Sequence, residues 1–214
     1  MKDPLHLLYP SACILCDSLL TEPGDLCPKC RKEAPFFKKS KRKREFLDSF
    51  TAVWYYEGYV RDSLLRFKFG RQPYLAEPYS RFLAEKIRQE YPDGFDILTW
   101  VPVSPLRRLT RGYDQCWLLA RALGCQLSRK PRRYLIKIRH NPAQSGLGDP
   151  ALRRANVRGA YRVLHEKELA GKRILLVDDI LTTGATAGEC ARMLKTKGAA
   201  EVHCAVVAVS AKTD

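Results

Sequence analysis

The stretch ILLVDDILTTGAT, residues 174–186, constrains the fold of this chain more than any other segment. Its four leading apolar residues predict a core strand buried on both faces, which is typical of a parallel sheet. Two carboxylates, Asp178 and Asp179, follow where we expect the strand to end. Because burying unpaired carboxylates is costly, the two acids indicate a ligand site rather than a packing choice.

The residues after the acids predict a binding site for an anion. They are small, and most carry hydroxyl groups: Thr182, Thr183, Gly184, Ala185 and Thr186. We expect them to form a turn that leads into a helix beginning near Ala187. Backbone N–H groups at the start of a helix, threonine hydroxyls and the helix dipole together suit a phosphate group. A strand, two acids and this turn would hold a phosphorylated sugar by both ends.

Two other interpretations of this stretch remain open. An apolar strand ending in two acids also occurs in the Walker B motif of ATPases. The chain contains no G-x-x-x-x-G-K-[ST] sequence to form the matching phosphate loop, which disfavours that interpretation. The other alternative is that the two acids lie in a turn without a function.

From residue 50 onward the chain alternates between segments typical of strands and of helices. We expect strands at 50–58, 96–103, 134–138, 172–179 and 200–210, and helices at 73–91, 113–123 and 186–198. This alternation predicts an α/β fold with a mostly parallel sheet and helices on both faces. In such sheets, ligands bind at the carboxyl ends of the strands.

We expect three parts in the chain: a metal-binding module at residues 1–35, a basic linker at 36–48 and the α/β domain at 49–214. The linker contains KKSKRKR, and like charges at that density cannot be buried together. No segment has the roughly 18 consecutive apolar residues of a membrane span, and the N-terminus lacks the apolar core of a signal peptide. We therefore expect a soluble, cytoplasmic protein.

The chain is strongly basic, with a formal net charge of +15 from 38 Lys and Arg against 23 Asp and Glu. A basic excess of this size predicts a polyanionic partner. Charge alone does not distinguish nucleic acid from a polyphosphate metabolite.

Four of the eight cysteines fall close together as C-x₂-C-x₁₀-C-x₂-C: Cys13, Cys16, Cys27 and Cys30. Two such pairs can direct four thiolates at one ion, which favours a closed, tetrahedral structural Zn²⁺ site. Four sulfur ligands also suit an iron–sulfur cluster, but nothing in the sequence indicates electron transfer. The other cysteines lie in apolar surroundings and are expected to be reduced and buried: Cys116, Cys125, Cys190 and Cys204.

Residues 174–186 match the signature of the type I phosphoribosyltransferases, and three further segments resemble the ComF family of competence-associated proteins. These segments are the paired cysteines, VPVSPLRRLTRGYDQ at residues 101–115 and QSGLGDPALRRANVRGAY at residues 144–161. The resemblance implies a type I phosphoribosyltransferase fold with an N-terminal zinc ribbon. It also implies that Asp178 and Asp179 bind the ribose hydroxyls of phosphoribosyl diphosphate and that residues 182–186 bind its 5′-phosphate. Mg²⁺ would bridge the diphosphate and the ribose.

The resemblance further implies two loops that contact the diphosphate. The loop after the second strand contributes Val103, Ser104, Arg107, Arg108 and Arg111. Arginine offers planar donors that stay charged, which suits this role. An ordinary solvated loop is the alternative.

The second loop, residues 139–150, is rich in Pro and Gly and is expected to be mobile. By the resemblance it closes over the diphosphate, with Gln144 and Ser145 as candidate contacts, whereas His140 is expected to be incidental. Asp114 departs from the Asn expected in the family, which leaves a ligand role for this position open.

Three functions are consistent with the sequence. The first is an enzyme that transfers phosphoribosyl to a nitrogenous acceptor, although no segment identifies that acceptor or a catalytic residue. The second, implied by the resemblance, is binding of single-stranded DNA in natural transformation, with a competence helicase or another DNA-processing protein as partner. The basic linker and the aromatic and basic residues at 54–69 would offer charge and stacking surfaces for DNA. The third is a regulator that senses phosphoribosyl diphosphate without turnover.

Overall fold

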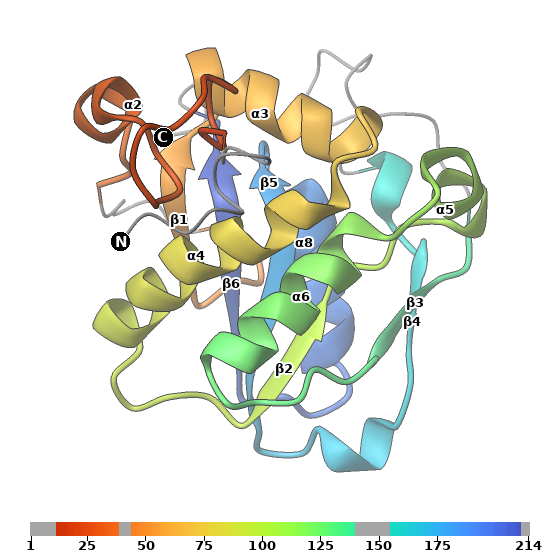
Figure 1. Ribbon diagram of the computed structural model, residues 1–214. Coiled ribbons are helices and arrows are strands. Elements are labelled where there is room, and N and C mark those ends of the chain that lie inside the picture. Colours follow the sequence, from red (N-terminus) through yellow and green to blue (C-terminus); the bar gives the residue numbers. More distant parts are fainter. Residues whose placement is uncertain (1–11, 39–43, 140–154, 211–214) are drawn as a thin grey trace.

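A four-stranded sheet organises the computed structural model, which describes residues 12–38, 44–139 and 155–210. Its strands, in the spatial order β1-β6-β5-β2, are β1 (Ser49–Tyr55), β6 (Glu201–Val209), β5 (Arg173–Leu181) and β2 (Ile97–Trp100). The pairings between them are parallel, so the predicted parallel sheet is confirmed (Figure 1). Strand β5, which carries the two acids, lies inside the sheet between β6 and β2.

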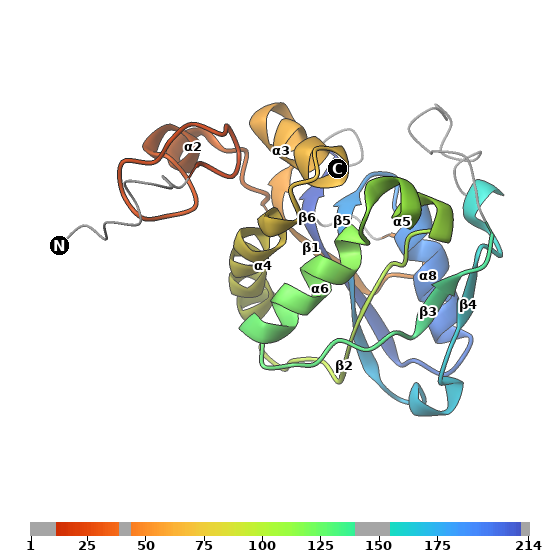
Figure 2. The ribbon, with the colours of Figure 1, turned by 45° about the vertical axis from the view of Figure 1, so that its right-hand side comes forward.

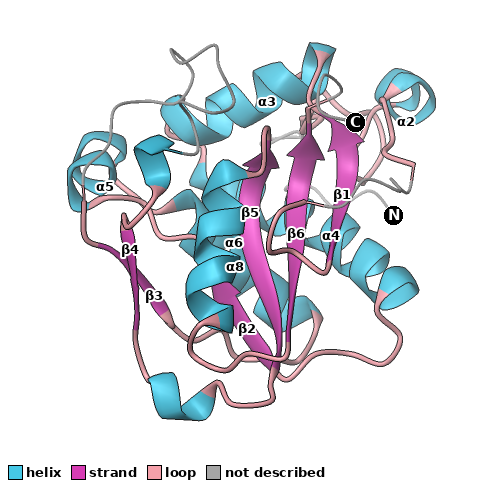
Figure 3. Ribbon diagram, turned by 180° about the vertical axis from the view of Figure 1, so that it is seen from behind, coloured by secondary structure: helices cyan, strands magenta, loops and turns pink. Residues whose placement is uncertain are grey.

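Successive residues of the inner strands alternate between two hydrophobic clusters, one on each face of the sheet. On β5, Val177 packs in one cluster and Leu176 in the other. The first face is covered by α4 (Ala76–Glu90) and α6 (Gln115–Gln126), and the second by α8 (Ala185–Lys195) (Figure 3). The predicted arrangement of helices on both faces is therefore confirmed.

Two helices that the sequence analysis does not predict lie at the C-terminal end of the sheet. Helix α3 (Gly58–Phe69) crosses above the ends of the strands. Helix α5 (Pro105–Arg111) lies at the upper right in Figure 1, to the right of these strand ends. Residues 54–69, expected to offer a stacking surface, instead contribute Trp54 and Phe67 to the core, where both are fully buried. The expectation is wrong for these two rings, because β1 and α3 turn them toward the sheet.

Segment 134–138 forms a strand as expected but does not join the parallel sheet. Strand β3 (Leu135–Lys137) pairs antiparallel with β4 (Tyr161–Val163) in a separate two-stranded sheet. The chain touches the edge of the main sheet just before β3, where the backbone N–H of Arg132 donates to the carbonyl oxygen of Leu98 at 3.0 Å. It then leaves that edge, because its next strand partner is β4 rather than β2.

The strand and helix around the acids differ from the expectation in their bounds. Strand β5 continues to Leu181, past the expected end at residue 179, so both acids lie inside the strand rather than at its end. Helix α8 begins at Ala185 rather than near Ala187, because Gly184 adopts a φ of 79° and forms the N-cap. The turn between strand and helix therefore spans residues 182–184.

The N-terminal part of the structure forms a small module around α2 (Pro28–Glu33), beside α3 and α4 (Figure 2). Ile14 and Leu15 of this module pack in the same cluster as the first face of the sheet. Two short 3₁₀ helices, η1 (Pro73–Leu75) and η3 (Glu166–Glu168), complete the described elements. None of the helices in the described ranges has the length and apolar character needed to span a membrane.

Gly188 tests how tightly α8 packs against the segment before β1. A Cβ added at this position would lie 2.9 Å from the carbonyl oxygen of Glu45. We expect Gly188→Ala to lower the free energy of unfolding by about 1–3 kcal/mol, because overpacking outweighs the better helix propensity of alanine. Chemical denaturation measures the change. A gain in stability would show instead that the backbone at Glu45 moves aside at little cost.

Candidate functional site

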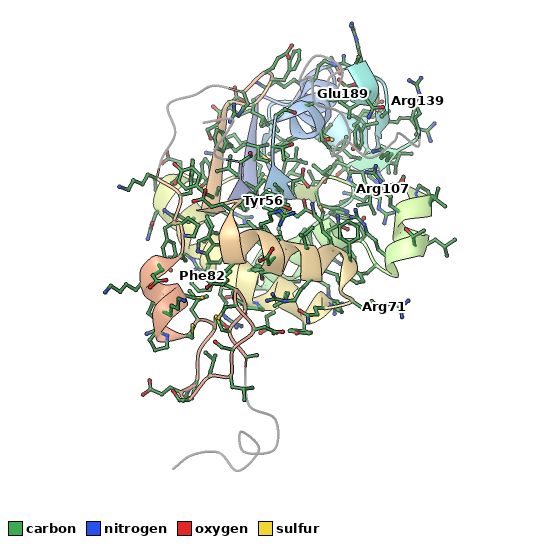
Figure 4. The ribbon with its side chains drawn as sticks, turned by 90° about the horizontal axis from the view of Figure 1, so that it is seen from above. Tyr56, Arg71, Phe82, Arg107, Arg139 and Glu189 are labelled. Atoms are coloured by element: carbon green, nitrogen blue, oxygen red, sulfur yellow. The ribbon has the colours of Figure 1, made fainter. Side chains whose placement is uncertain are left out.

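The C-terminal end of the sheet opens into a cavity of about 650 Å³. Strand β5 contributes Asp178 and Asp179 to its lining, α3 lines one part and α5 another. Figure 4 looks down on this end of the molecule, with Tyr56 next to α3 and Arg107 on the side of α5. The position agrees with the general rule that ligands bind at the carboxyl ends of parallel strands.

Both acids are buried, and side chains from other elements bind each of them. Lys68 Nζ, from α3, lies 2.9 Å from Asp179 Oδ1, and Gln115 Nε2, from α6, donates to Asp179 Oδ2 at 3.0 Å. Cys116 Sγ, also from α6, donates to Asp178 Oδ1 at 3.3 Å. These contacts offset the cost of taking two neighbouring carboxylates out of water.

The environment of the acid pair changes the pKa of Asp178. Burial and the neighbouring charge of Asp179 raise the pKa of Asp178 from 3.8 to about 7. Burial alone would lower the pKa of Lys68, but the charge of Asp179 and the hydrogen bond to it outweigh burial and raise that pKa. Lys68 therefore stays protonated, and Asp178 exchanges a proton near neutral pH.

The turn after β5 and the start of α8 line the cavity beside the acids. Four of the five predicted phosphate-binding residues contribute to the lining: Thr182, Gly184, Ala185 and Thr186. Thr183 does not line the cavity; its Oγ1 accepts a hydrogen bond from the backbone N–H of Ala185 at 3.4 Å, which stabilises the turn. The start of α8 directs the positive end of its dipole at this place, which suits an anion.

Another part of the lining is strongly basic. Arg107 and Arg111 come from α5, and Lys137 comes from β3. Burial and the charge of Arg111 lower the pKa of Arg107, and burial and the charge of Arg107 lower the pKa of Lys137. With Lys68 and Arg71, the described lining holds five cationic side chains against two carboxylates. This excess favours a polyanionic ligand.

The structure separates the residues predicted for the diphosphate loop. Val103, Arg107 and Arg111 line the cavity. Ser104 is buried and caps α5, where its Oγ accepts a hydrogen bond from the backbone N–H of Arg107 at 3.4 Å. Arg108 lines a separate hollow outside the cavity.

Asp114 has a local structural role. Its Oδ1 accepts a hydrogen bond from the backbone N–H of Trp117 at 3.0 Å, which makes it the N-cap of α6. Asp and Asn cap helices about equally well, so the departure from Asn preserves this contact. Gln144, Ser145, His140 and residues 39–43 of the basic linker lie outside the described residues.

The lining also includes polar side chains that were not predicted for the site, among them Lys68, Gln115, Cys116 and Lys137. Lys68 lies in RFKFG, where alternating basic and aromatic residues suit an exposed surface equally well. Lys137 lies in YLIKI, and a lone lysine inside an apolar strand is a signal that an anion lies nearby. Gln115 and Cys116 follow the cap of α6 and carry no separate signal.

The four clustered cysteines fit a tetrahedral zinc ion. Their sulfur atoms lie within 4.8 Å of one another, and those of Cys16 and Cys27 are 3.7 Å apart. Zn–S bonds of about 2.3 Å place two tetrahedral sulfurs about 3.8 Å apart. The backbone N–H of Cys30 donates to Cys27 Sγ at 3.4 Å, a contact that orients a metal-bound thiolate. Zinc bound there would join the segment that carries Cys13 and Cys16 to the segment that carries Cys27 and Cys30.

The remaining cysteines divide into two kinds. Cys116, Cys190 and Cys204 are buried, as expected, whereas Cys125 is exposed. The expectation is wrong for Cys125, because the core-facing positions of α6 around it are Leu123 and Gly124.

The chain is similar to known families and proteins over most of its length. The chain matches the family described as Phosphoribosyl transferase domain over residues 80–213, and Double zinc ribbon domain over residues 4–42. It is 28% identical over 215 residues to Competence protein ComFC of Bacillus subtilis (strain 168), covering 92% of this chain and 83% of that protein. It is 28% identical over 212 residues to DNA utilization protein YhgH of Escherichia coli (strain K12), covering 94% and 91%. A solved structure, the allosteric regulatory enzyme of purine biosynthesis, aligns with a TM-score of 0.43 and 23% identity over 66% of this chain and 29% of that chain.

The raised pKa of Asp178 predicts a pH-dependent cost of folding. Between about pH 4 and pH 7 the folded protein keeps a proton that the unfolded chain releases, so wild-type stability falls as pH rises through that window. Asp178→Asn removes this cost. We expect its Tm to exceed the wild-type value at pH 8 by at least about 3 °C, the shift that roughly 1 kcal/mol produces at this size.

The gain should shrink toward pH 4, and thermal unfolding at both pH values measures it. Asp62→Asn is the control, because Asp62 is exposed on α3 and pairs only with Arg61 among the described ion pairs. An Asp178→Asn gain of equal size at both pH values would contradict a titrating carboxylate.

The cysteines predict a pattern of thiol reactivity. In zinc-loaded protein, Cys125 should react rapidly with Ellman's reagent, because it is exposed and outside the cluster. After native chelation the four thiols of the cluster should react as well. Cys125→Ser is the control and should leave the loaded protein without a rapidly reacting thiol. Rapid reaction of all four cluster thiols before chelation would contradict metal binding.

Proposed function

The chain belongs to the ComF family of phosphoribosyl transferase domain proteins, and we propose that its cavity binds phosphoribosyl diphosphate with Mg²⁺. One observation carries this proposal: a single cavity brings together a carboxylate pair, a threonine-lined helix start and a group of cations. Phosphoribosyl diphosphate offers matching groups, namely ribose hydroxyls, a 5′-phosphate and a diphosphate.

Each part of the cavity has a role in this proposal. The acid pair of β5 accepts hydrogen bonds from the ribose hydroxyls, and residues 182–186 bind the 5′-phosphate. Arg107, Arg111 and Lys137 bind the diphosphate, whose negative charge offsets the burial and the mutual repulsion that lower the pKa values of Arg107 and Lys137. Mg²⁺ would be held mainly by ligand oxygens, because it prefers phosphate and water to an all-protein cage.

The same groups suit transfer of the phosphoribosyl group to a nitrogenous acceptor. The diphosphate is the leaving group in this reaction. Fixed positive charge beside it stabilises the negative charge that develops on the diphosphate as its bond to the ribose breaks. A sensor would use the same contacts without releasing diphosphate. Measuring diphosphate release separates these two forms of the proposal.

We place this activity in DNA uptake or processing in the cytoplasm. The support is that a competence protein and a DNA utilization protein match 92% and 94% of this chain. The net charge of +15 favours contact with single-stranded DNA, and a competence helicase or another DNA-processing protein is the proposed partner. Because Trp54 and Phe67 are buried, phosphate contacts rather than stacking on these rings would carry such binding.

Neighbouring arginines on α5 offer a matched test of ligand binding. Arg107 lines the cavity and Arg108 does not, so Arg107→Met and Arg108→Met remove the same charge from the same helix. Calorimetry with phosphoribosyl diphosphate and Mg²⁺ should show an affinity about 10- to 100-fold lower for Arg107→Met, the range expected for a lost charged hydrogen bond. Arg108→Met should bind like the wild type.

Asp179→Asn extends the test to the acids. It should also weaken binding, because the amide cannot accept from a ribose hydroxyl as strongly as a carboxylate. Absence of binding by the folded, zinc-loaded wild type would refute the proposal. Equal losses in both arginine variants would place the ligand outside the cavity.

A further inference from the structure

Helix α3 contacts both the cysteine module and the ligand cavity. Ser63 and Arg66 bind the module, whereas Leu65, Lys68 and Phe69 line the cavity. Each group has the spacing of three or four residues that places side chains on one side of a helix. In Figure 2 the module around α2 lies directly beside α3. A single helix therefore connects the metal cluster with the ligand site.

The module is held through backbone carbonyls that lie between its first two cysteines. Arg66 Nη2 donates to the carbonyl oxygens of Ile14 and Leu15 at 3.0 and 3.1 Å, and the hydroxyl of Ser63 also donates to the oxygen of Ile14. Both apolar side chains are buried. Cys13 and Cys16 flank these two residues, so one metal ion bound by both cysteines would fix the direction of the two carbonyls.

The same helix sets the position of the cation beside the acids. Lys68 lies two residues after Arg66, and its Nζ is 2.9 Å from Asp179 Oδ1. The buried residues Leu64 and Phe67 fix how deeply α3 packs on the core. Apolar contacts are not directional, so they hold the helix on the core without fixing its rotation as closely as hydrogen bonds do. The hydrogen bonds to the carbonyls are directional and oppose that rotation.

We propose that the zinc module positions a residue of the ligand site that it does not itself line. Through Ser63 and Arg66 it fixes the rotation of α3 and thereby the position of Lys68 beside Asp179. Arg66 is thus a positioning residue, and the inference rests on the proposed binding of phosphoribosyl diphosphate. Loss of zinc frees the carbonyls and lets α3 rotate, which weakens ligand binding, because errors of about 1 Å matter in a positioned site.

Linkage makes the coupling reciprocal. A ligand that requires α3 in this position also holds the carbonyls that Arg66 binds, so it stabilises the zinc-loaded module. Saturating ligand should therefore slow the transfer of zinc to a chelating dye. We expect a factor of about five or more, the lower end of typical coupling between two sites. A helix with only a structural role would show no such effect of the ligand.

The test compares Arg66→Met with Arg61→Met, using full-length, zinc-loaded protein. Both changes remove an arginine from α3, but Arg61 is exposed and pairs with Asp62. Calorimetry gives the affinity for phosphoribosyl diphosphate with Mg²⁺, and a chelating dye gives the rate of zinc release with and without that ligand. Ser63→Ala, a smaller change at the same contact, serves as a second variant if Arg66→Met does not fold.

We expect Arg66→Met to bind the ligand at least about fivefold more weakly and to lose the slowing of zinc release. Arg61→Met should match the wild type in both. If wild type binds but its zinc release is unaffected by ligand, or if Arg66→Met and Ser63→Ala keep both properties, the coupling is wrong while the proposed function stands. If wild type does not bind, the proposed function fails and the coupling fails with it.

Discussion

Two adjacent buried carboxylates in an inner strand need partners from other elements, because the strand itself offers only the backbone N–H of Asp179, which donates to Asp178 Oδ1 at 2.9 Å. Lys68 reaches Asp179 from a helix above the strand ends, and Gln115 and Cys116 reach the acids from a helix on one face. Helices α3 and α6 are therefore fixed by polar contacts as well as by their apolar faces. The cost of burying the acids also explains why Asp178 holds its proton to a higher pH than an ordinary carboxyl.

The fold class could be predicted because its signals are local in the sequence. The four apolar residues before Asp178 identify an inner strand, and the small residues after Asp179 identify the start of a helix. The expected α/β phosphoribosyltransferase fold with an N-terminal zinc ribbon is confirmed. The cysteine spacing likewise predicted a cluster whose sulfur atoms the structure brings together.

The partners of the acids could not be predicted in the same way, because they come from distant segments. Lys68 precedes Asp179 by more than a hundred residues, and only the tertiary structure brings the two together. The alternating aromatic and basic residues around Lys68 resemble an exposed surface, yet tertiary packing buries Phe67 and leaves Phe69 at the cavity. Strand β3 shows the same limit, since its residues indicate a strand but not which strand it pairs with.

The strand order has a consequence for synthesis of the protein. Strand β6 lies between β1 and β5, and its pairing with β1 joins residues as far apart in sequence as Ser49 and His203. Such long-range parallel pairing slows folding, because the entropy of closing a large loop is lost before the stabilising contacts between the strands form. On the ribosome, β1 and β5 therefore emerge without the strand that joins them. Their apolar edges stay open to other chains until β6 has been made.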